Sequence, residues 1–158
     1  MTFKTRLMTT LGSAALCAGL SMAAAGSASA HNVLNVSEAP AGHLFPMVLN
    51  VNHGCKGAPV IGARVQIPDG IVDAKAVDKQ GWEIEYKMRE LETPVMLHGR
   101  EVKEVIGEIV WKNPADTIPS DGWATFEFRG TIPKEVGKVM HFKNITVCEG
   151  GKTDPYVD

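Results

Sequence analysis

Apolar residues after residue 30 recur mostly at every second position, which is typical of strands with one buried face. Residues 82–88 alternate between apolar and charged side chains. Residues 123–129 alternate again, with Phe126 and Phe128 on one face and Trp123, Thr125, Glu127 and Arg129 on the other. Helical spacing of apolar residues is scarce, whereas turn-forming residues are frequent. The pattern therefore predicts an all-β domain.

Turn-forming residues divide this part of the chain into eight or nine short strands. Pro68-Asp69-Gly70 predicts a turn, and His98-Gly99 between two β-rich segments predicts a hairpin. Pro46 interrupts an apolar run, so we expect an edge strand or a bulge there. Strands are expected at residues 33–36, 44–51, 63–67, 71–77, 82–88, 105–111, 123–129 and 139–147. This spacing favours a two-sheet sandwich with a polar tail, residues 149–158, along its surface.

Residues 1–30 have a different character. Lys4 and Arg6 are followed by the uncharged stretch 7–25 and then by the small residues Ala28-Ser29-Ala30. This order is typical of a secretory signal peptide that is cleaved after its last small residue. We therefore expect residues 1–30 to be removed and the mature domain, residues 31–158, to act in the bacterial periplasm.

The mature chain has the size of one domain with a single core. Loss of the two signal-peptide cations changes the formal net charge from −2 to about −4. A mildly acidic chain without basic clusters is a poor candidate for nucleic-acid binding. No second apolar run is long enough to span a bilayer, so we expect no membrane anchor in the mature form.

The cysteines point to the same compartment. Cys17 leaves with the signal peptide, and a lipidated Cys17 is disfavoured because Leu16 rather than a small residue precedes it. Cys55 and Cys148 remain, and two cysteines in an oxidising compartment normally pair. We therefore expect a disulfide between Cys55 and Cys148. The alternative is a thiolate pair that binds metal, which export disfavours.

Several short motifs follow one another in an order that resembles the YcnI-like copper-binding domain family. Together they extend over essentially the whole mature chain. The motifs are the run from His31 to Gly42, His53-Gly54-Cys55-x-Gly57, Val65-x-Ile67-Pro68-x-Gly70, Gly81-Trp82, Ile109-Val110-Trp111, Phe126-x-Phe128-Arg129-Gly130 and the late Cys148. The resemblance implies an immunoglobulin-like β-sandwich.

The resemblance also implies a Cu(II) site built on a single histidine. Its ligands would be the N-terminal amine and the side chain of the first mature residue, here His31, together with an acidic side chain and a nearby tryptophan. Thr125 stands where the family commonly has a glutamate. Tyr156 is the nearest aromatic residue where the family commonly has a tryptophan close to the domain's end. The resemblance thus supports His31 and leaves the other ligands open.

The chemistry of a mature N-terminal histidine favours copper independently of this resemblance. Cleavage after Ala30 exposes an α-amine, and this amine and the imidazole Nδ1 of His31 close a chelate ring because they belong to one residue. Cu(II) is bound most tightly by N/O sites among the divalent first-row metals. Copper must displace protons from both nitrogens, so its affinity should fall as the pH drops. Alternatively, His31 is simply the residue that follows the cleavage site.

Two further residues are candidate ligands. Glu127 lies two residues beyond Thr125 on the same strand face, where its carboxylate could replace the missing glutamate. The alternative is an ordinary solvated strand residue. His53 lies beside the expected disulfide, where it either binds the metal or forms a hydrogen bond within its own loop.

These features favour a periplasmic copper-binding protein, not an enzyme, that stores, buffers or delivers Cu(II), with a copper-trafficking protein as a partner. The sequence contains no Gly-rich phosphate loop and no Gly-x-Ser-x-Gly, His-Glu-x-x-His or Cys-x-x-Cys motif. A metal-free interaction or adhesion sandwich is the main alternative. A copper-dependent oxidative enzyme is a further one, which would need His98 or His141 as a second histidine ligand.

Overall fold

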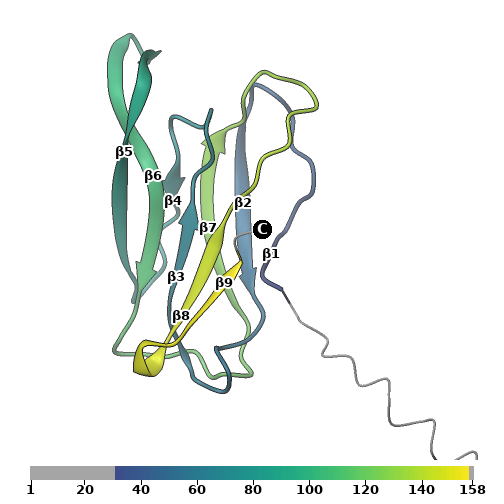
Figure 1. The fold of residues 1–158 in the computed structure, drawn as a ribbon, viewed down its shortest axis with the longest axis vertical. Helices are drawn as coiled ribbons and strands as arrows, with labels where there is room; N and C mark the ends of the chain where they lie inside the picture. Colours follow the sequence, from purple (N-terminus) through teal and green to yellow (C-terminus); the bar gives the residue numbers. More distant parts are fainter. Residues whose placement is uncertain (1–30, 157–158) are drawn as a thin grey trace, which may run out of the picture.

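A computed structural model describes residues 31–156, so the signal peptide expected at residues 1–30 lies outside the described residues. The described chain forms two antiparallel sheets that face each other (Figure 1). The four-stranded sheet has the order β1-β2-β7-β4, with β1 Val33–Leu34, β2 Leu44–Val51, β7 Ala124–Thr131 and β4 Lys75–Ala76. The five-stranded sheet has the order β5-β6-β3-β8-β9, with β5 Glu83–Leu97, β6 Arg100–Lys112, β3 Val60–Gln66, β8 Asn144–Cys148 and β9 Thr153–Tyr156. The expected all-β sandwich is confirmed.

The core lies between the inner faces of the two sheets, as strand alternation requires. In β7, Ala124, Phe126 and Phe128 are buried, whereas the residues between them are exposed. Phe126 and Phe128 pack against Trp111 of β6, with ring-centroid distances of 5.4 and 6.4 Å. Aromatic rings bury large apolar areas, so these contacts are a major part of what holds the sheets together.

The longest element is the hairpin β5–β6, which extends beyond the ends of the other strands (Figure 1). Leu97 pairs with Arg100, and His98 and Gly99 between them have positive φ angles of 49° and 77°. Two positive φ angles in a two-residue loop are the mark of a type I′ turn, whose twist matches that of the flanking strands. The hairpin predicted at His98-Gly99 is therefore confirmed.

Pro46 lies in a part of β2 that is open on one side. β2 is flanked by β1 and β7, but β1 pairs only with Leu49 and Asn50. Pro46 itself pairs with Arg129 of β7 alone among the described strands. A proline lacks a backbone N–H, so it fits this half-open stretch, although β2 is an inner strand and not the edge strand that Pro46 led us to expect.

Several stretches differ from the expected strands: β1 ends at Leu34 instead of residue 36, and β5 and β6 extend well beyond residues 82–88 and 105–111. Within residues 71–77 only Lys75–Ala76 pairs as a strand, because the Asp73 carboxylate binds the backbone N–H and the hydroxyl of Thr131, at 2.7 and 2.6 Å. Such side-chain bonds give the backbone an alternative to a strand ladder. The strand expected over residues 139–147 begins only at residue 144. The polar tail, expected along the surface, adds β9 to the sheet.

Cys55 and Cys148 form the expected disulfide, with their Cα atoms 5.9 Å apart. Cys55 lies in the loop that leads from β2 to β3, and Cys148 ends β8. Both cysteines are buried, so the bond is part of the core. It fixes the crossover between the two sheets to the end of β8. Within residues 31–156, no helix has the length and apolar character that crossing a bilayer requires.

Candidate metal centre

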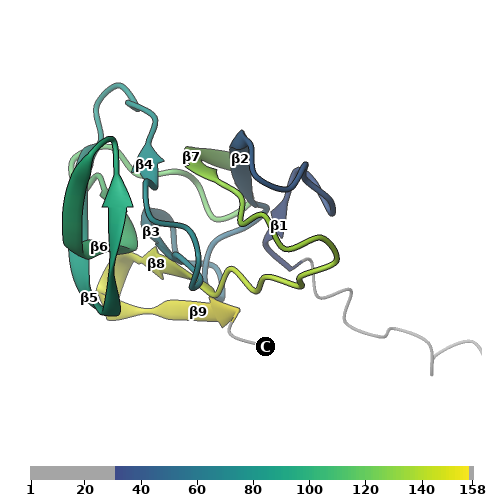
Figure 2. The same ribbon diagram turned by 90° about the horizontal axis from the view of Figure 1, so that it is seen from above.

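His31 lies where the edges of the two sheets come together. β1 is an edge strand of one sheet and β9 of the other, and the two lie on the same side of the sandwich (Figure 2). The His31 carbonyl accepts a hydrogen bond of 2.9 Å from Nδ2 of Asn52, the residue that follows β2. This bond fixes the backbone of His31 to the four-stranded sheet.

Asn32 fixes the same segment to the five-stranded sheet. Its side chain is buried, and its Nδ2 donates to Oδ1 of Asn144 and Oγ1 of Thr146, at 2.8 and 2.9 Å. Both acceptors belong to β8. The first residues of a domain usually fray unless they are tied down. Here side-chain hydrogen bonds to both sheets make His31 a fixed point at the edge of the sandwich.

The His31 ring contacts Tyr156 of β9. The two ring centroids are 5.7 Å apart and the planes are inclined by 70°, an edge-to-face contact. The Tyr156 hydroxyl donates to Oδ2 of Asp154 at 3.0 Å. Asp154 is a residue that the sequence analysis missed, because the tail was expected only along the surface. The sequence did contain a clue, because Asp154 precedes Tyr156 by two residues and such residues share one face of a strand.

Burial raises the pKa of Tyr156 to about 12, and the hydrogen bond to Asp154 and the charge of that carboxylate act in the same direction. Only the protonated phenol can donate this hydrogen bond. At neutral pH Tyr156 therefore remains a donor and holds the Asp154 carboxylate beside the ring that His31 contacts.

His53 follows Asn52, the residue that holds His31. Its Nδ1 lies 2.8 Å from the backbone carbonyl of Gly54. A carbonyl partner requires the proton on Nδ1, and in that tautomer the lone pair is on Nε2. Metal-ligating histidines commonly have such a carbonyl partner, and so do histidines that only support a loop. The geometry is compatible with both roles expected for His53.

Glu127 lies on the outer face of β7, where it is exposed and opposite Val48 of β2. Asn52 lies four residues after Val48, just past the end of β2, which corresponds to roughly 13 Å at strand spacing. Thr125, where the family commonly has a glutamate, is nearer to that end because it pairs with Asn50. The register therefore does not bring Glu127 to His31.

Among residues 31–156 there is no group of three His, Cys, Asp or Glu side chains that could hold a metal ion. The donors linked by these contacts are the His31 imidazole and, through Tyr156, the Asp154 carboxylate, and the expected cleavage after Ala30 would add the α-amine of His31. Two nitrogens and one oxygen are a donor set that suits Cu(II). Asn32 Oδ1 is buried beside this position and has no hydrogen-bond partner in the described part of the chain.

A family model described as a domain of unknown function, DUF1775, matches residues 31–158. This chain belongs to the DUF1775 family. No curated protein matches this DUF1775 chain at a significant level.

Two solved structures are similar to this DUF1775 domain. An uncharacterized protein from Nocardia farcinica with an immunoglobulin-like fold is 13% identical, with a TM-score of 0.60 over 79% of this chain and 82% of that chain. A DUF4466 family protein from Parabacteroides merdae is 15% identical, with a TM-score of 0.40 over 80% of this chain and 42% of that chain. The first likeness shows that the sandwich is immunoglobulin-like, as expected.

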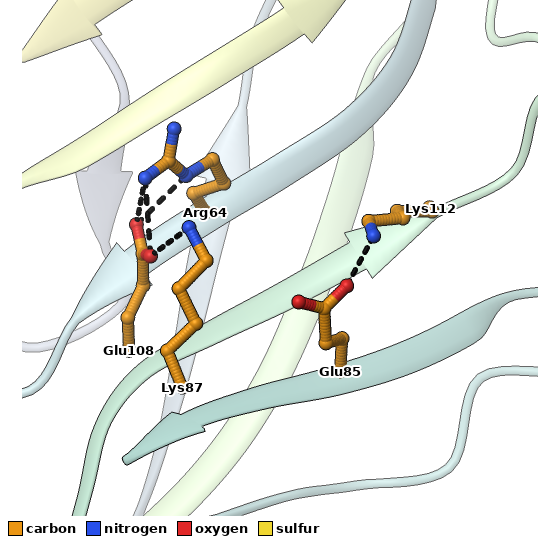
Figure 3. A network of polar contacts seen from close by, with 5 residues as sticks. All are labelled: Arg64, Glu85, Lys87, Glu108 and Lys112. Atoms are coloured by element: carbon orange, nitrogen blue, oxygen red, sulfur yellow. Dashed lines mark hydrogen bonds and ion pairs between the residues drawn. The ribbon is translucent and has the colours of Figure 1, made fainter. Parts of the chain in front are cut away.

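A charged cluster on the second sheet is a separate feature of the DUF1775 domain (Figure 3). Arg64 donates to both oxygens of Glu108 at 2.7 and 3.0 Å, and Lys87 lies 2.8 Å from the same carboxylate. Glu85 and Lys112 form a second ion pair, and its hydrogen bond and opposite charges lower the pKa of Glu85 and raise that of Lys112. Because opposite charges compensate each other, this cluster fastens β5 and β6 to β3.

Proposed function

We propose that this DUF1775 domain is an exported copper-binding protein of the periplasm. It holds one Cu(II) ion through the mature N-terminal residue His31 and stores, buffers or delivers the metal without turnover. The proposal includes membership of the YcnI-like branch of copper-binding domains, whose motifs the chain resembles, and a copper-trafficking protein as the partner that receives or supplies the ion.

The observation that carries the proposal is the way in which His31 is held. Asn52 binds its carbonyl, and Asn32 is buried against Asn144 and Thr146. A chelate of α-amine and imidazole needs a chain terminus with little freedom, because ordering a loose terminus on binding would cost affinity. A terminus of arbitrary sequence has no reason to be fixed from both sheets. The anchoring therefore supports a role for the group that cleavage creates.

A storage or delivery role is favoured over an oxidative enzyme by the location of the other histidines. Apart from His53, the candidates for a second histidine ligand are His98 and His141. His98 forms the turn of the β5–β6 hairpin, whose tip lies away from the edge formed by β1 and β9 (Figure 1). His141 lies in the loop before β8, among residues that line a groove with Arg89 and Lys143.

The test compares two forms of the protein, one that begins at His31 and one that retains Ala30. Calorimetric titration with Cu(II) should show one site in the first form. The extended form should bind more weakly by at least the 10- to 100-fold that is typical of disturbing a ligand's outer shell, because it loses a ligand outright. The EPR spectrum of the extended form should also change.

The pH dependence provides a second measurement on the form that begins at His31. Its affinity should fall as the pH drops, because protons compete for both nitrogens. Equal affinity and identical spectra for the two forms would remove the N-terminal chelate. If the form that begins at His31 binds no Cu(II), a metal-free interaction sandwich takes the place of the proposed function.

A further inference from the structure

We propose that Asp154, oriented by Tyr156, supplies the carboxylate of the copper site that His31 begins. The inference rests on the proposed function and adds a ligand that neither the family resemblance nor the sequence pattern assigns. Strand β9 thereby becomes the part of the fold that completes the site from the second sheet.

The ladder between β8 and β9 sets this geometry. Asn144 pairs with Tyr156 and Thr146 pairs with Asp154. Directly opposed residues of neighbouring strands present their side chains on the same face. Asn144 and Thr146 also bind the Asn32 side chain. The residues that hold Asn32 are thus the same ones that lie opposite Tyr156 and Asp154. The clamp that fixes position 32 also brings His31 into contact with Tyr156, whose hydroxyl binds Asp154.

The contacts of Tyr156 give its ring two roles. One edge-to-face contact joins it to the His31 imidazole, with centroids 5.7 Å apart. Its hydroxyl orients the Asp154 carboxylate through a bond of 3.0 Å. Outer-sphere hydrogen bonds to ligating groups commonly fix their orientation in metal sites. Tyr156 is thus a positioning residue, and Asp154 is the ligand.

The charge and donor count agree with this assignment. The α-amine and imidazole of His31 are neutral when they bind, so a carboxylate supplies the negative charge that a divalent cation favours. The buried Oδ1 of Asn32, which has no partner among residues 31–156, can accept a hydrogen bond from the α-amine. Buried acceptors are normally satisfied, so this oxygen is available to a donor that the expected cleavage would create.

The experiment uses variants of the form that begins at His31. Asp154→Asn removes the charged ligand and keeps the shape of the side chain. Tyr156→Phe removes the orienting hydroxyl and keeps the ring. Glu127→Gln is the matched control, since Glu127 is the other carboxylate that the sequence suggests and lies on the outer face of β7.

We expect Asp154→Asn to weaken Cu(II) binding by about 100-fold and Tyr156→Phe by about tenfold, the range seen for such sites. The copper hyperfine splitting in the EPR spectrum should change in Asp154→Asn. Glu127→Gln should leave both the affinity and the spectrum unchanged. Paramagnetic broadening in the unaltered protein should reach the amide signals of Asp154 and Thr146 and spare that of Glu127, a readout that needs no variant to fold.

Several outcomes overturn the inference while the proposed function stands. Unchanged affinity and spectrum in Asp154→Asn, in a protein whose unaltered form binds Cu(II), would exclude Asp154. A loss confined to Glu127→Gln, or broadening at Glu127 instead of at β9, would assign the carboxylate to β7. If the unaltered form binds no Cu(II), the proposed function itself fails, and the inference fails with it.

Discussion

Tyr156 couples the candidate site to the stability of the fold at high pH. Its pKa is raised to about 12 by burial and by Asp154, so the folded state favours the protonated phenol. This contribution to stability is complete below the ordinary pKa of tyrosine, near 10, and is lost as the pH rises through about 12. We therefore expect the free energy of unfolding to decrease between about pH 10 and pH 12.

Urea unfolding across this pH range measures the effect, and the ultraviolet absorbance of the phenolate follows the titration directly. Asp154→Asn should lower the pKa of Tyr156, because it removes the negative charge beside the phenol. Tyr156→Phe should flatten the dependence of stability on pH. A slope that persists in Tyr156→Phe would assign the alkaline loss to other groups.

At the scale of single residues, the sequence predicts functional residues whose role depends on neighbours in the chain, but not those whose role depends on contacts made in the fold. His31 and the Cys55–Cys148 pair could be singled out because the signal for cleavage and export is written in consecutive residues of the chain. Asp154 could not, since its importance depends on the register of β9 against β8. A carboxylate in a polar tail has the same appearance in the sequence whether it faces solvent or a neighbouring ring.

The segment that leads into β1 should owe its order to Asn32. Asn32→Ala removes two hydrogen bonds and leaves Asn144 and Thr146 with unsatisfied buried groups. We expect a loss of about 1–3 kcal/mol in the free energy of unfolding, measured by urea denaturation. Hydrogen exchange of the Asn35 amide, which donates to the Val48 carbonyl at 2.9 Å, should also become faster, because β1 is only two residues long.

Asn50→Ala provides the control for this change. Its side chain makes one long, solvent-exposed hydrogen bond, 3.3 Å to the Val33 carbonyl. Substitutions at such positions usually change stability by no more than about 0.5 kcal/mol. Equal losses in the two variants would show that burial of the Asn32 amide is not what holds the segment.

At the scale of elements, turns with strict backbone demands could be predicted, and strands of marginal length could not. The His98-Gly99 turn follows from the preference of tight hairpins for residues that tolerate positive φ. The run 71–77 has suitable strand residues, yet the Asp73 carboxylate captures Thr131 and shortens the strand to two residues. The sequence does not state which side chain will compete with a ladder.

At the scale of the whole molecule, the alternation of apolar residues and the spacing of turns were enough to predict a two-sheet sandwich. The alternation within each strand indicates which of its faces is buried. The order of the strands was not predictable from these patterns. It depends on pairings between distant segments, such as β3 with β8, whose free energies are set by packing across the completed core. The juxtaposition of β1 and β9, which brings His31 to Tyr156, belongs to this level.

The disulfide links global stability to the candidate site. It closes a loop with a sequence separation of 93 residues, and removing a native disulfide from a small domain typically costs about 2–5 kcal/mol. Asn52 lies three residues before Cys55, and Thr146 lies two residues before Cys148, so the bond fixes the two segments that hold His31 and Asn32.

We expect a double variant, Cys55→Ala with Cys148→Ala, to lose stability and to bind Cu(II) more weakly even where it is still folded. A variant is preferable to a reducing agent, which would also reduce Cu(II). Urea denaturation gives the stability, and calorimetry below the unfolding transition gives the affinity. Undiminished affinity in the folded double variant would show that the anchors of His31 hold without the disulfide. The bond would then stabilise the sandwich without shaping its edge.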